Sequence, residues 1–412
     1  MSNFYQRKVA QESVGQDIVP DNTELPLDSV EGVLSEVASD TAAIDQMDSE
    51  AATLAEDGDE VDAQFQQVDD TIKAADAGEE GVDEDMSDEA VTAIDVAQES
   101  IRRRWGLNHR QTLARESYGR GNRRHAVRES LWDDIKAFFR RIWEWLKTQG
   151  RKIKDRWINF HNQGKSIQKR SKKYDAAIRG LGSKKQDEIK GGFIKQLSEN
   201  GSFVGGNMST LNGHLTATAG LPAGVEAMLN EASSKTDQVA NGAAQGGFTA
   251  KVNMPSFVKQ FAGAGTHEQL GSKVVKVEVE GEDWNMTFID SEKDVPADVK
   301  TPSTSELNSL NTFYNKVGIE VEKRAKAYEK VNSTREKFES SIEKLLNKID
   351  KVDAKDNESL VENIRNLRKE VSKVSSVVGV LEKVQANTIT CLTSGVNGYL
   401  AAGIAAYDKR KG

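Results

Sequence analysis

Cysteine is almost missing from this sequence, in which Cys391 is the single one among 412 residues. This excludes an intramolecular disulfide and the zinc sites that need two or four thiolates. The five histidines are scattered, and no two stand four residues apart around a glutamate, so we interpret them as ordinary buried or solvated side chains. The N-terminus has no apolar stretch typical of a signal peptide. We therefore expect a soluble protein of a reducing compartment that holds no metal and no other cofactor.

Basic side chains are nearly missing from the first quarter of the chain. Residues 1–99 hold 28 acidic side chains against 3 basic ones, a net charge of −25. Residues 100–190 hold 26 basic and 9 acidic side chains, a net charge of +17, whereas residues 191–412 are close to neutral. Such an asymmetry indicates an acidic tail beside a region that binds a polyanion or a membrane surface.

Aromatic side chains are also rare in residues 1–99, where only Phe4, Tyr5 and Phe65 occur. So little apolar surface does not offset the entropy lost on ordering, and we predict an acidic disordered segment with transient helix. Two short amphipathic runs, residues 33–43 and 63–72, could become helical against a basic partner. A disordered segment does not hold two carboxylates at a fixed separation, so acid–base catalysis is not expected here.

A repeated tetrapeptide marks the place where the charge changes sign. Ala-Gln-Glu-Ser occurs at residues 10–13 and 97–100, and Arg-Glu-Ser junctions follow at 115–117 and 128–130. We interpret the repeated Glu-Ser step as a reused recognition signal. It predicts that residues 1–99 are a propeptide that is cut away, and that residues 100–129 are a basic linker with further junctions. The glutamates that precede the candidate cuts are Glu12, Glu99, Glu116 and Glu129.

Residues 130–190 predict a basic aromatic amphipathic helix. An apolar stripe with a 3.6-residue period runs from Leu131 to Phe160 and includes four of the six tryptophans, with lysines and arginines on its flanks. Ser130 and Asp133 predict a capping box at its start, and Gly150 predicts a break or kink. The cations proposed to bind nucleic acid are Arg102, Arg103, Arg104, Arg140, Arg141, Arg151, Lys152, Lys154, Lys169, Arg170, Lys172 and Lys173.

The basic helix has three interpretations that the sequence leaves open. Its cations could neutralise phosphates, which would give salt-dependent binding without sequence preference, while the aromatic rings stack on single-stranded bases. The rings could instead sink into a membrane interface. They could also pack against the C-terminal helices and leave the cations solvated, which is the common outcome for rings at helical spacing.

The middle of the chain, residues 191–302, is rich in glycine and predicts a small α+β module. Val275, Val277 and Val279 alternate with charged residues before a turn and Trp284, which predicts a β-hairpin near residues 274–289. The glycines fit no phosphate-binding loop, because none opens a helix after a buried strand.

The C-terminal part, residues 303–412, predicts two long helices joined by a polar turn, that is, an antiparallel helical hairpin. The stretch from Val384 to Tyr407 is uncharged and long enough to span a bilayer. Its polar side chains and a row of small residues favour a tightly packed soluble helix instead. That row consists of Ser394, Gly398, Ala402 and Ala406. The predicted fold class is therefore mainly α with a small α+β module.

No catalytic constellation is recognisable in the sequence. Cys391 lies in a helix of small residues and has no evident histidine partner, which is typical of a packing role. We therefore predict that the chain is not an enzyme.

The arrangement from Ala97 to Lys190 resembles the internal head (inner body) proteins of phiKZ-like jumbo bacteriophages. The Glu-Ser junctions, the basic aromatic helix and the Lys/Arg-rich run behind it carry this resemblance. It implies an N-terminal propeptide removed by a prohead protease that cuts after glutamate in a small-x-Glu context. Glu99 and Glu116 have alanine at the P3 position of that pattern. Glu129 has valine there and departs from it, and Glu12 would release only a stub.

The resemblance also implies where the protein acts and with what. It implies a virion interior protein, packaged with genomic DNA that it binds without sequence preference, beside other capsid-interior proteins, and then ejected into the host cytoplasm. One alternative is a membrane-active effector that uses the Trp/Lys-rich helix and the uncharged C-terminal helix. Another is a host-directed enzyme or inhibitor with a deep polar pocket in residues 191–300. The sequence leaves the oligomeric state open.

Overall fold

The structure is a computed structural model, and it describes residues 53–75 (except 55), 86–107, 123–242, 258, 266–280, 283–352 and 357–410. Long helices dominate it, and four small antiparallel sheets accompany them. The predicted fold class, mainly α with a small α+β part, is confirmed.

The basic region forms one continuous helix, α4 (Arg123–Arg179), of 57 residues. Ser130 lies inside it and is not its cap; the Ser130 hydroxyl donates to Gln98 Oε1 at 3.1 Å. The predicted break at Gly150 is wrong as well. Gly150 packs against α9 (Thr304–Ile349), where an added Cβ would lie 3.3 Å from Arg335 Cδ. Tertiary packing therefore overrides the poor helix propensity of glycine here.

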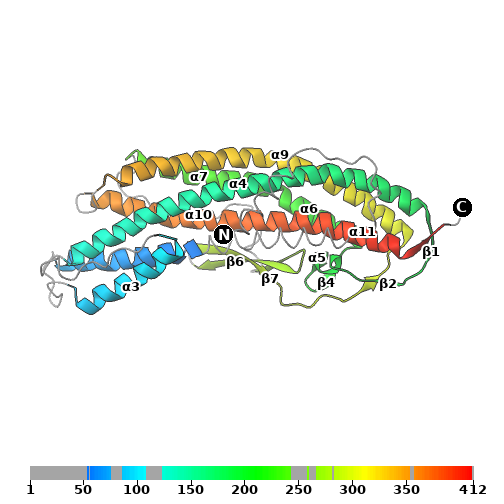
Figure 1. Cartoon of the computed structure of the whole chain (residues 1–412), viewed down its shortest axis with the longest axis horizontal. Helices are drawn as coiled ribbons and strands as arrows, with labels where there is room; N and C mark the ends of the chain where they lie inside the picture. The colour runs from blue at the N-terminus through cyan, green and yellow to red at the C-terminus, as the bar shows by residue number, and fades with distance from the viewer. Residues whose placement is uncertain are drawn as a thin grey trace, which may run out of the picture.

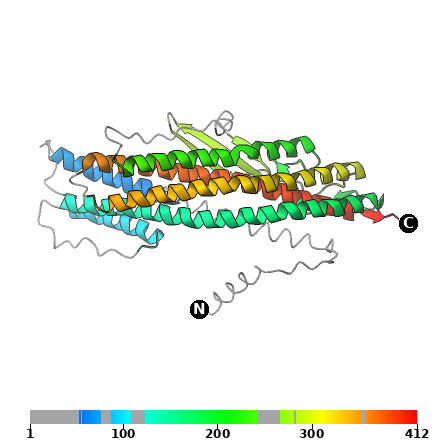
Figure 2. The ribbon, with the colours of Figure 1, turned by 90° about the horizontal axis from the view of Figure 1, so that it is seen from above.

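The helices α4, α7 (Leu221–Ala240), α9 and α10 (Glu358–Thr390) form a long bundle (Figures 1 and 2). Helix α9 runs antiparallel to α4 and shares with it the most extensive helix–helix interface. In this interface the Trp157 ring stacks on Tyr328, with centroids 3.8 Å apart and planes 16° from parallel. Gly164 and Gly318 let the two backbones approach closely, because a Cβ on Gly164 would lie 2.8 Å from the Gly318 carbonyl oxygen.

The predicted C-terminal helical hairpin is confirmed, since α10 returns antiparallel to α9. The Tyr328 hydroxyl donates to Gln385 Oε1 at 2.7 Å, and Arg335 pairs with Glu382 at 2.5 Å. Helix α7, which was not predicted, packs along both α9 and α10. Lys235 of α7 pairs with the buried Glu370 of α10 at 2.5 Å.

The uncharged end of α10 continues through a π-helical turn, Cys391–Gly395, into α11 (Val396–Ala405). Added Cβ atoms on Gly395 and Gly398 would lie 2.9 Å from Leu197 and 3.0 Å from Phe193 of the neighbouring segment. The small residues therefore serve close packing inside the protein, as predicted. Within the described ranges, no helix combines the length and the hydropathy needed to cross a membrane.

The predicted hairpin is confirmed as β6 (Lys273–Glu280) and β7 (Asp283–Asp290), in which Val275 pairs with Phe288 and Val277 with Met286. A further strand, β5 (Thr266–Gln269), extends this sheet. The short elements are α5 (Phe193–Gln196), α6 (Met208–Ala217) and a 3-10 turn, Thr218–Gly220. The two-stranded pairs are β1 (Leu181–Lys184) with β9 (Tyr407–Lys409), β2 (Glu188–Ile189) with β8 (Val299–Lys300), and β3 (Ser198–Glu199) with β4 (Ser202–Phe203).

The described part of the acidic segment is helical, and this corrects the expectation of disorder for those residues. Residues 56–75 (the acidic helix) and α3 (Asp88–Arg104) pack on one end of the bundle. The acidic helix buries one apolar stripe, formed by Leu54 just before it and by Val61, Phe65, Val68 and Ile72. Docking supplies the apolar contacts that the segment lacks by itself. The amphipathic run 63–72 thus folds against a basic partner, whereas run 33–43 lies outside the described residues.

We expect Gly164→Val to lower the free energy of unfolding by about 1–3 kcal/mol, because the new side chain would overpack the α4–α9 crossing. Urea unfolding followed by circular dichroism measures this. Gly213→Ala in α6 is the matched control, since a Cβ there meets nothing within 4 Å. Its stability should stay unchanged or rise by up to about 1 kcal/mol. Equal effects of the two substitutions would contradict the close crossing.

Candidate functional site

The acidic helix lies against α3, α4 and α10, at the end of the bundle far from the C-terminus (Figure 1). It holds seven carboxylates and one lysine. Three of these carboxylates, on Asp57, Asp62 and Asp69, are buried and face cations of the body. The site is therefore an intramolecular interface between a negative helix and a positive surface.

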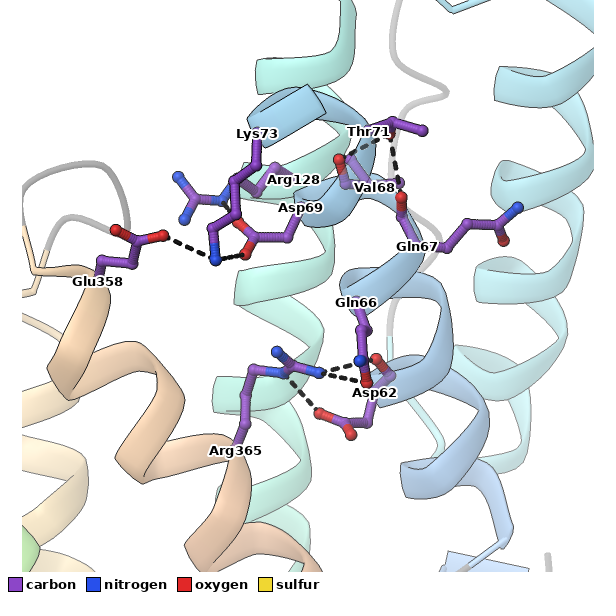
Figure 3. Close-up of polar contacts among 10 residues, drawn as sticks. All are labelled: Asp62, Gln66, Gln67, Val68, Asp69, Thr71, Lys73, Arg128, Glu358 and Arg365. Atoms are coloured by element: carbon purple, nitrogen blue, oxygen red, sulfur yellow. Dashed lines mark hydrogen bonds and ion pairs between the residues drawn. The ribbon is translucent and has the colours of Figure 1, made fainter. Parts of the chain in front are cut away.

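Asp62 is the most highly connected carboxylate of the interface. Its oxygens lie 2.7 Å from Arg365 Nε, 3.1 Å from Lys369 Nζ and 3.7 Å from Arg368 Nη2, all on α10. Figure 3 shows the Arg365 contacts with Asp62 and Gln66. Burial acts to raise the pKa of Asp62, but the hydrogen bond from Arg365 and the three positive charges outweigh it and hold the pKa below its usual value.

Phe65, one turn further along, is held between two guanidinium groups. The charged carbon of Arg365 lies 5.0 Å from the ring centroid, and that of Arg128 lies 5.7 Å from it. The Trp132 ring of α4 is tilted by 52° at 6.3 Å. Arginine over an aromatic face is favourable, and more so where water is excluded, so the ring adds both burial and cation–π attraction.

The far end of the acidic helix is fixed by three ion pairs (Figure 3). Asp69 pairs with Arg128 Nε at 2.7 Å. Lys73 bridges Asp69 at 2.9 Å and Glu358, the first residue of α10, at 2.8 Å. Hydrogen bonds to Glu358 and Asp69 raise the pKa of Lys73. The helix is thereby linked to both α4 and α10.

The near end of the acidic helix fits closely on the body. Arg104 of α3 donates through Nε to Asp57 at 2.8 Å. Next to it, a Cβ on Gly58 would lie 2.7 Å from both Arg368 Nη1 and the Phe138 ring. Only glycine lets the helix backbone approach this surface so closely.

Helix α3 is held on α4 by buried and charged contacts. Ile101 and Trp105 are buried, and the Trp105 ring lies 6.2 Å from that of Phe138. Arg102 pairs with the buried Asp134 at 2.5 Å. Both N-terminal helices therefore belong to one packed end of the molecule.

The predicted nucleic-acid-binding cations fall into two groups. The cations before Gly150 are engaged with carboxylates: Arg102 with Asp134, Arg103 with Glu99, Arg104 with Asp57, Arg140 with Asp350 and Arg141 with Glu144. Each pair reduces the charge that its cation presents to a polyanion, and in two of the pairs the carboxylate, on Asp57 or Asp134, is buried.

The cations after Gly150 stand on the exposed face of α4, opposite Trp157 and Phe160. They extend over about 33 Å of helix. Arg170, which is half-buried and interacts with Tyr314, is the exception. The exposed members, referred to below as the basic stripe, are Arg151, Lys152, Lys154, Lys169, Lys172 and Lys173.

The tryptophans of α4 belong to the core. Trp132, Trp145 and Trp157 are at most 8% exposed. Trp143 is half-buried, with Lys147 Nζ 3.4 Å from its ring centroid. In this fold the buried rings are available neither for stacking on bases nor for insertion into a membrane interface, so core packing is the interpretation that the structure supports.

Two of the four candidate cut sites lie inside helices. Glu99 is in α3, where its neighbours Gln98 and Ile101 are buried. Glu129 is in α4, between the buried Arg128 and Ser130. Glu116 lies in the chain between α3 and α4, and both Glu116 and Glu12 are outside the described residues.

The middle of the chain contains a hollow of about 520 Å³ that opens to the solvent. Glu199, His214, His267 and Glu268 are among the residues that line it, and His214 Nε2 lies 3.2 Å from Glu199 Oε2. In the part of the chain that the structure describes, no group of three or more His, Cys, Asp or Glu side chains is arranged to hold a metal ion. Cys391 is buried, which raises the pKa of its thiol to about 12 and leaves it protonated.

The cations of α10 that receive the acidic helix were not among the predicted site residues. Arg365, Arg368 and Lys369 stand at i, i+3 and i+4 and so share one face of α10. This spacing was visible in the sequence, but its role depends on a helix about 300 positions away in the chain.

We expect Asp62→Asn to release the acidic helix, because three cations of α10 lose their shared partner. Removing one partner of a buried ion pair typically costs on the order of 3 kcal/mol. Hydrogen exchange of the full-length protein, read at the amides of residues 56–75, measures the loss of protection. Asp70→Asn is the matched control, since Asp70 is on the same helix and exposed. It should change protection by less than about 0.5 kcal/mol.

The lowered pKa of Asp62 adds a pH test to the same experiment. A carboxylate whose pKa is lowered by docking stabilises the docked state above its usual pKa, and this contribution is lost as the pH falls through the lowered value. Wild-type protection of residues 56–75 should therefore decline below about pH 4, with a smaller decline in Asp62→Asn. Identical pH profiles would contradict the role of Asp62.

Comparisons with known proteins agree with the resemblance found in the sequence. No curated protein and no solved structure matches the chain. The profile of one protein family, described as phiKZ-like phage internal head proteins, matches residues 39–405. This match covers the described parts of the acidic helix, the bundle and the small sheets almost completely. The chain therefore belongs to the phiKZ-like phage internal head proteins.

Proposed function

We propose that this internal head protein is packaged with the phage genome and binds DNA without sequence preference through the basic stripe of α4. In the proposal a prohead protease first removes the acidic segment, and the body then enters the host cytoplasm with the genome. Ejection rests on family membership alone. The role is binding rather than catalytic, in keeping with the buried, protonated thiol of Cys391.

The observation that carries the proposal is the exposure of the basic stripe. Its six cations face solvent, whereas the ion pairs that the described part of α4 makes involve other cations. Lysines and arginines along about 33 Å of helix can each displace a counterion from a DNA backbone. Such contacts read charge and not base sequence, which suits a protein that must bind any part of a genome.

The acidic segment would oppose this binding before the cut. A cut after Glu116 would divide the chain into a fragment of net charge −21 and a body of net charge +12. While the two are joined, the described helix of the segment docks on the first half of α4 and on α10, and its negative charge lowers the attraction of the whole chain for phosphates. Removing it therefore favours DNA binding.

Glu116 is the favoured cut site among the four candidates. A protease needs several residues of extended chain, and both Glu99 and Glu129 lie in helices with buried neighbours. Cutting there would require local unfolding, which costs free energy. Glu116 has the alanine at P3 and lies between the two helices.

We expect the protein recovered from mature virions to begin at Ser117, and Glu116→Gln to block this cut. Mass spectrometry of the protein isolated from virions identifies its first residue and therefore the cut site. Glu129→Gln is the matched control and should leave processing unchanged. An intact Met1 in mature particles would contradict processing altogether, and Ser100 as the first residue would move the cut into α3.

For DNA binding we expect the triple substitution Lys169→Gln, Lys172→Gln and Lys173→Gln to weaken binding of the full-length protein to duplex DNA. Each lost phosphate contact should reduce the slope of log K against log salt by about 0.9, or by about 2–3 for the three. Fluorescence anisotropy over a range of salt concentrations measures this slope.

The control is the triple substitution Arg103→Gln, Arg141→Gln and Arg179→Gln, whose cations each pair with a carboxylate within one turn. It removes the same number of charges and should change the slope less. Equal slopes for both triples would contradict a specific role of the basic stripe. Masking would be contradicted if the uncut and the particle-borne protein bound DNA with the same affinity and salt slope.

A further inference from the structure

The surface under the acidic helix has the features of a receptor site. It is formed by Arg128, Trp132 and Phe138 of α4 and by Arg365 and Arg368 of α10 (the docking surface). Arg368 is fully buried beneath the acidic helix, with its charged carbon 5.6 Å from the Phe138 ring centroid. The surface thus combines positive charge with aromatic rings.

The acidic helix matches the docking surface residue by residue. Gly58 allows contact with Arg368 and Phe138, Asp62 meets Arg365, and Phe65 fits between Arg365 and Arg128. These residues stand at i, i+4 and i+7, which is one face of a helix. A surface that selects a small residue, a carboxylate and a ring in this order recognises a helix, and not simply negative charge.

We infer that the docking surface also accepts the acidic helix of a second copy of this chain in place of its own. All the contacts described are made by side chains on separate elements, so none requires the helix and the surface to belong to one molecule. Twelve residues join the acidic helix to α3, and eighteen join α3 to α4, which gives the chain length for an exchange. Each copy carries one helix and one surface, so two copies satisfy each other in a closed, symmetric dimer.

The balance between the two arrangements depends on concentration. A tethered helix competes at an effective concentration on the order of millimolar, so a dilute, uncut chain docks its own helix. Copies crowded to that concentration inside a head exchange helices. This inference does not depend on the cut or on DNA binding.

The test uses two full-length variants, Asp62→Lys and Arg365→Glu. Each variant places like charges together, so neither docks its own helix nor that of an identical copy. In a mixture, the unchanged helix of the Arg365→Glu chain meets the unchanged surface of the Asp62→Lys chain. The two substituted positions also face each other there, and they carry opposite charges. Native mass spectrometry should show each variant alone as a monomer, and the mixture as a 1:1 complex.

Hydrogen exchange provides a readout that guards against misfolding. Protection of residues 56–75 in the Arg365→Glu chain should rise at least tenfold when the Asp62→Lys chain is added. The double variant Asp62→Lys/Arg365→Glu, which restores opposite charges within one chain, should regain part of its protection without a partner. Absence of the 1:1 complex together with unchanged protection in the mixture would overturn the inference.

Duplex DNA supplies the last arm of the test. The mixed complex is also prepared with Lys169→Gln, Lys172→Gln and Lys173→Gln in both chains, which weakens the basic stripe. If DNA dissociates this complex as strongly as the complex without these three substitutions, the docking surface itself binds phosphate. That result would also overturn the inference. DNA binding that leaves the mixed complex intact supports it, and does so whether or not the basic stripe proves to be the DNA site.

Discussion

The burial of one face of α4 against α9 governs the rest of the molecule. Trp157 stacks on Tyr328, and Gly164 and Gly318 bring the two helices into close contact, so the aromatic side of α4 is fixed inward. The cations between the aromatic positions must then face away from the bundle. Their number makes α4 a long positive surface. Its charge must be neutralised either by carboxylates of the protein or by an external polyanion.

The two halves of α4 differ in how their positive charge is neutralised. The first half is covered by α3 and the acidic helix, and its cations meet carboxylates: Arg128 pairs with Asp69, Arg140 with Asp350 and Arg141 with Glu144. The second half carries the basic stripe and faces solvent. The protein thus neutralises the charge of the first half with its own carboxylates and leaves the charge of the second half to an external polyanion. Both surfaces belong to one continuous helix.

Local periodicity was sufficient to predict the long helices, the hairpin of β6 and β7 and the packing of the small C-terminal residues. It failed where distant contacts decide the outcome. Gly150 does not break α4, because α9 supports it, and Ser130 bonds to Gln98 instead of capping a helix. The composition of the acidic helix is too polar to fold by itself, and it therefore predicts disorder. Its partners, Arg365 and Arg368, stand on a helix near the other end of the sequence. The pattern of residues within one segment does not reveal which distant segment packs against it.

Arg368 has a consequence for the body once the acidic helix leaves it. If the docking surface consisted of leucines, departure of the acidic helix would expose an apolar patch to solvent. Such patches promote aggregation. Arginine side chains instead cover rings such as Phe138 with their stems and turn a hydrated charge outward. The same residues that hold the helix can therefore keep the uncovered body dispersed, so the chain tolerates both the covered and the bare state without changing its fold.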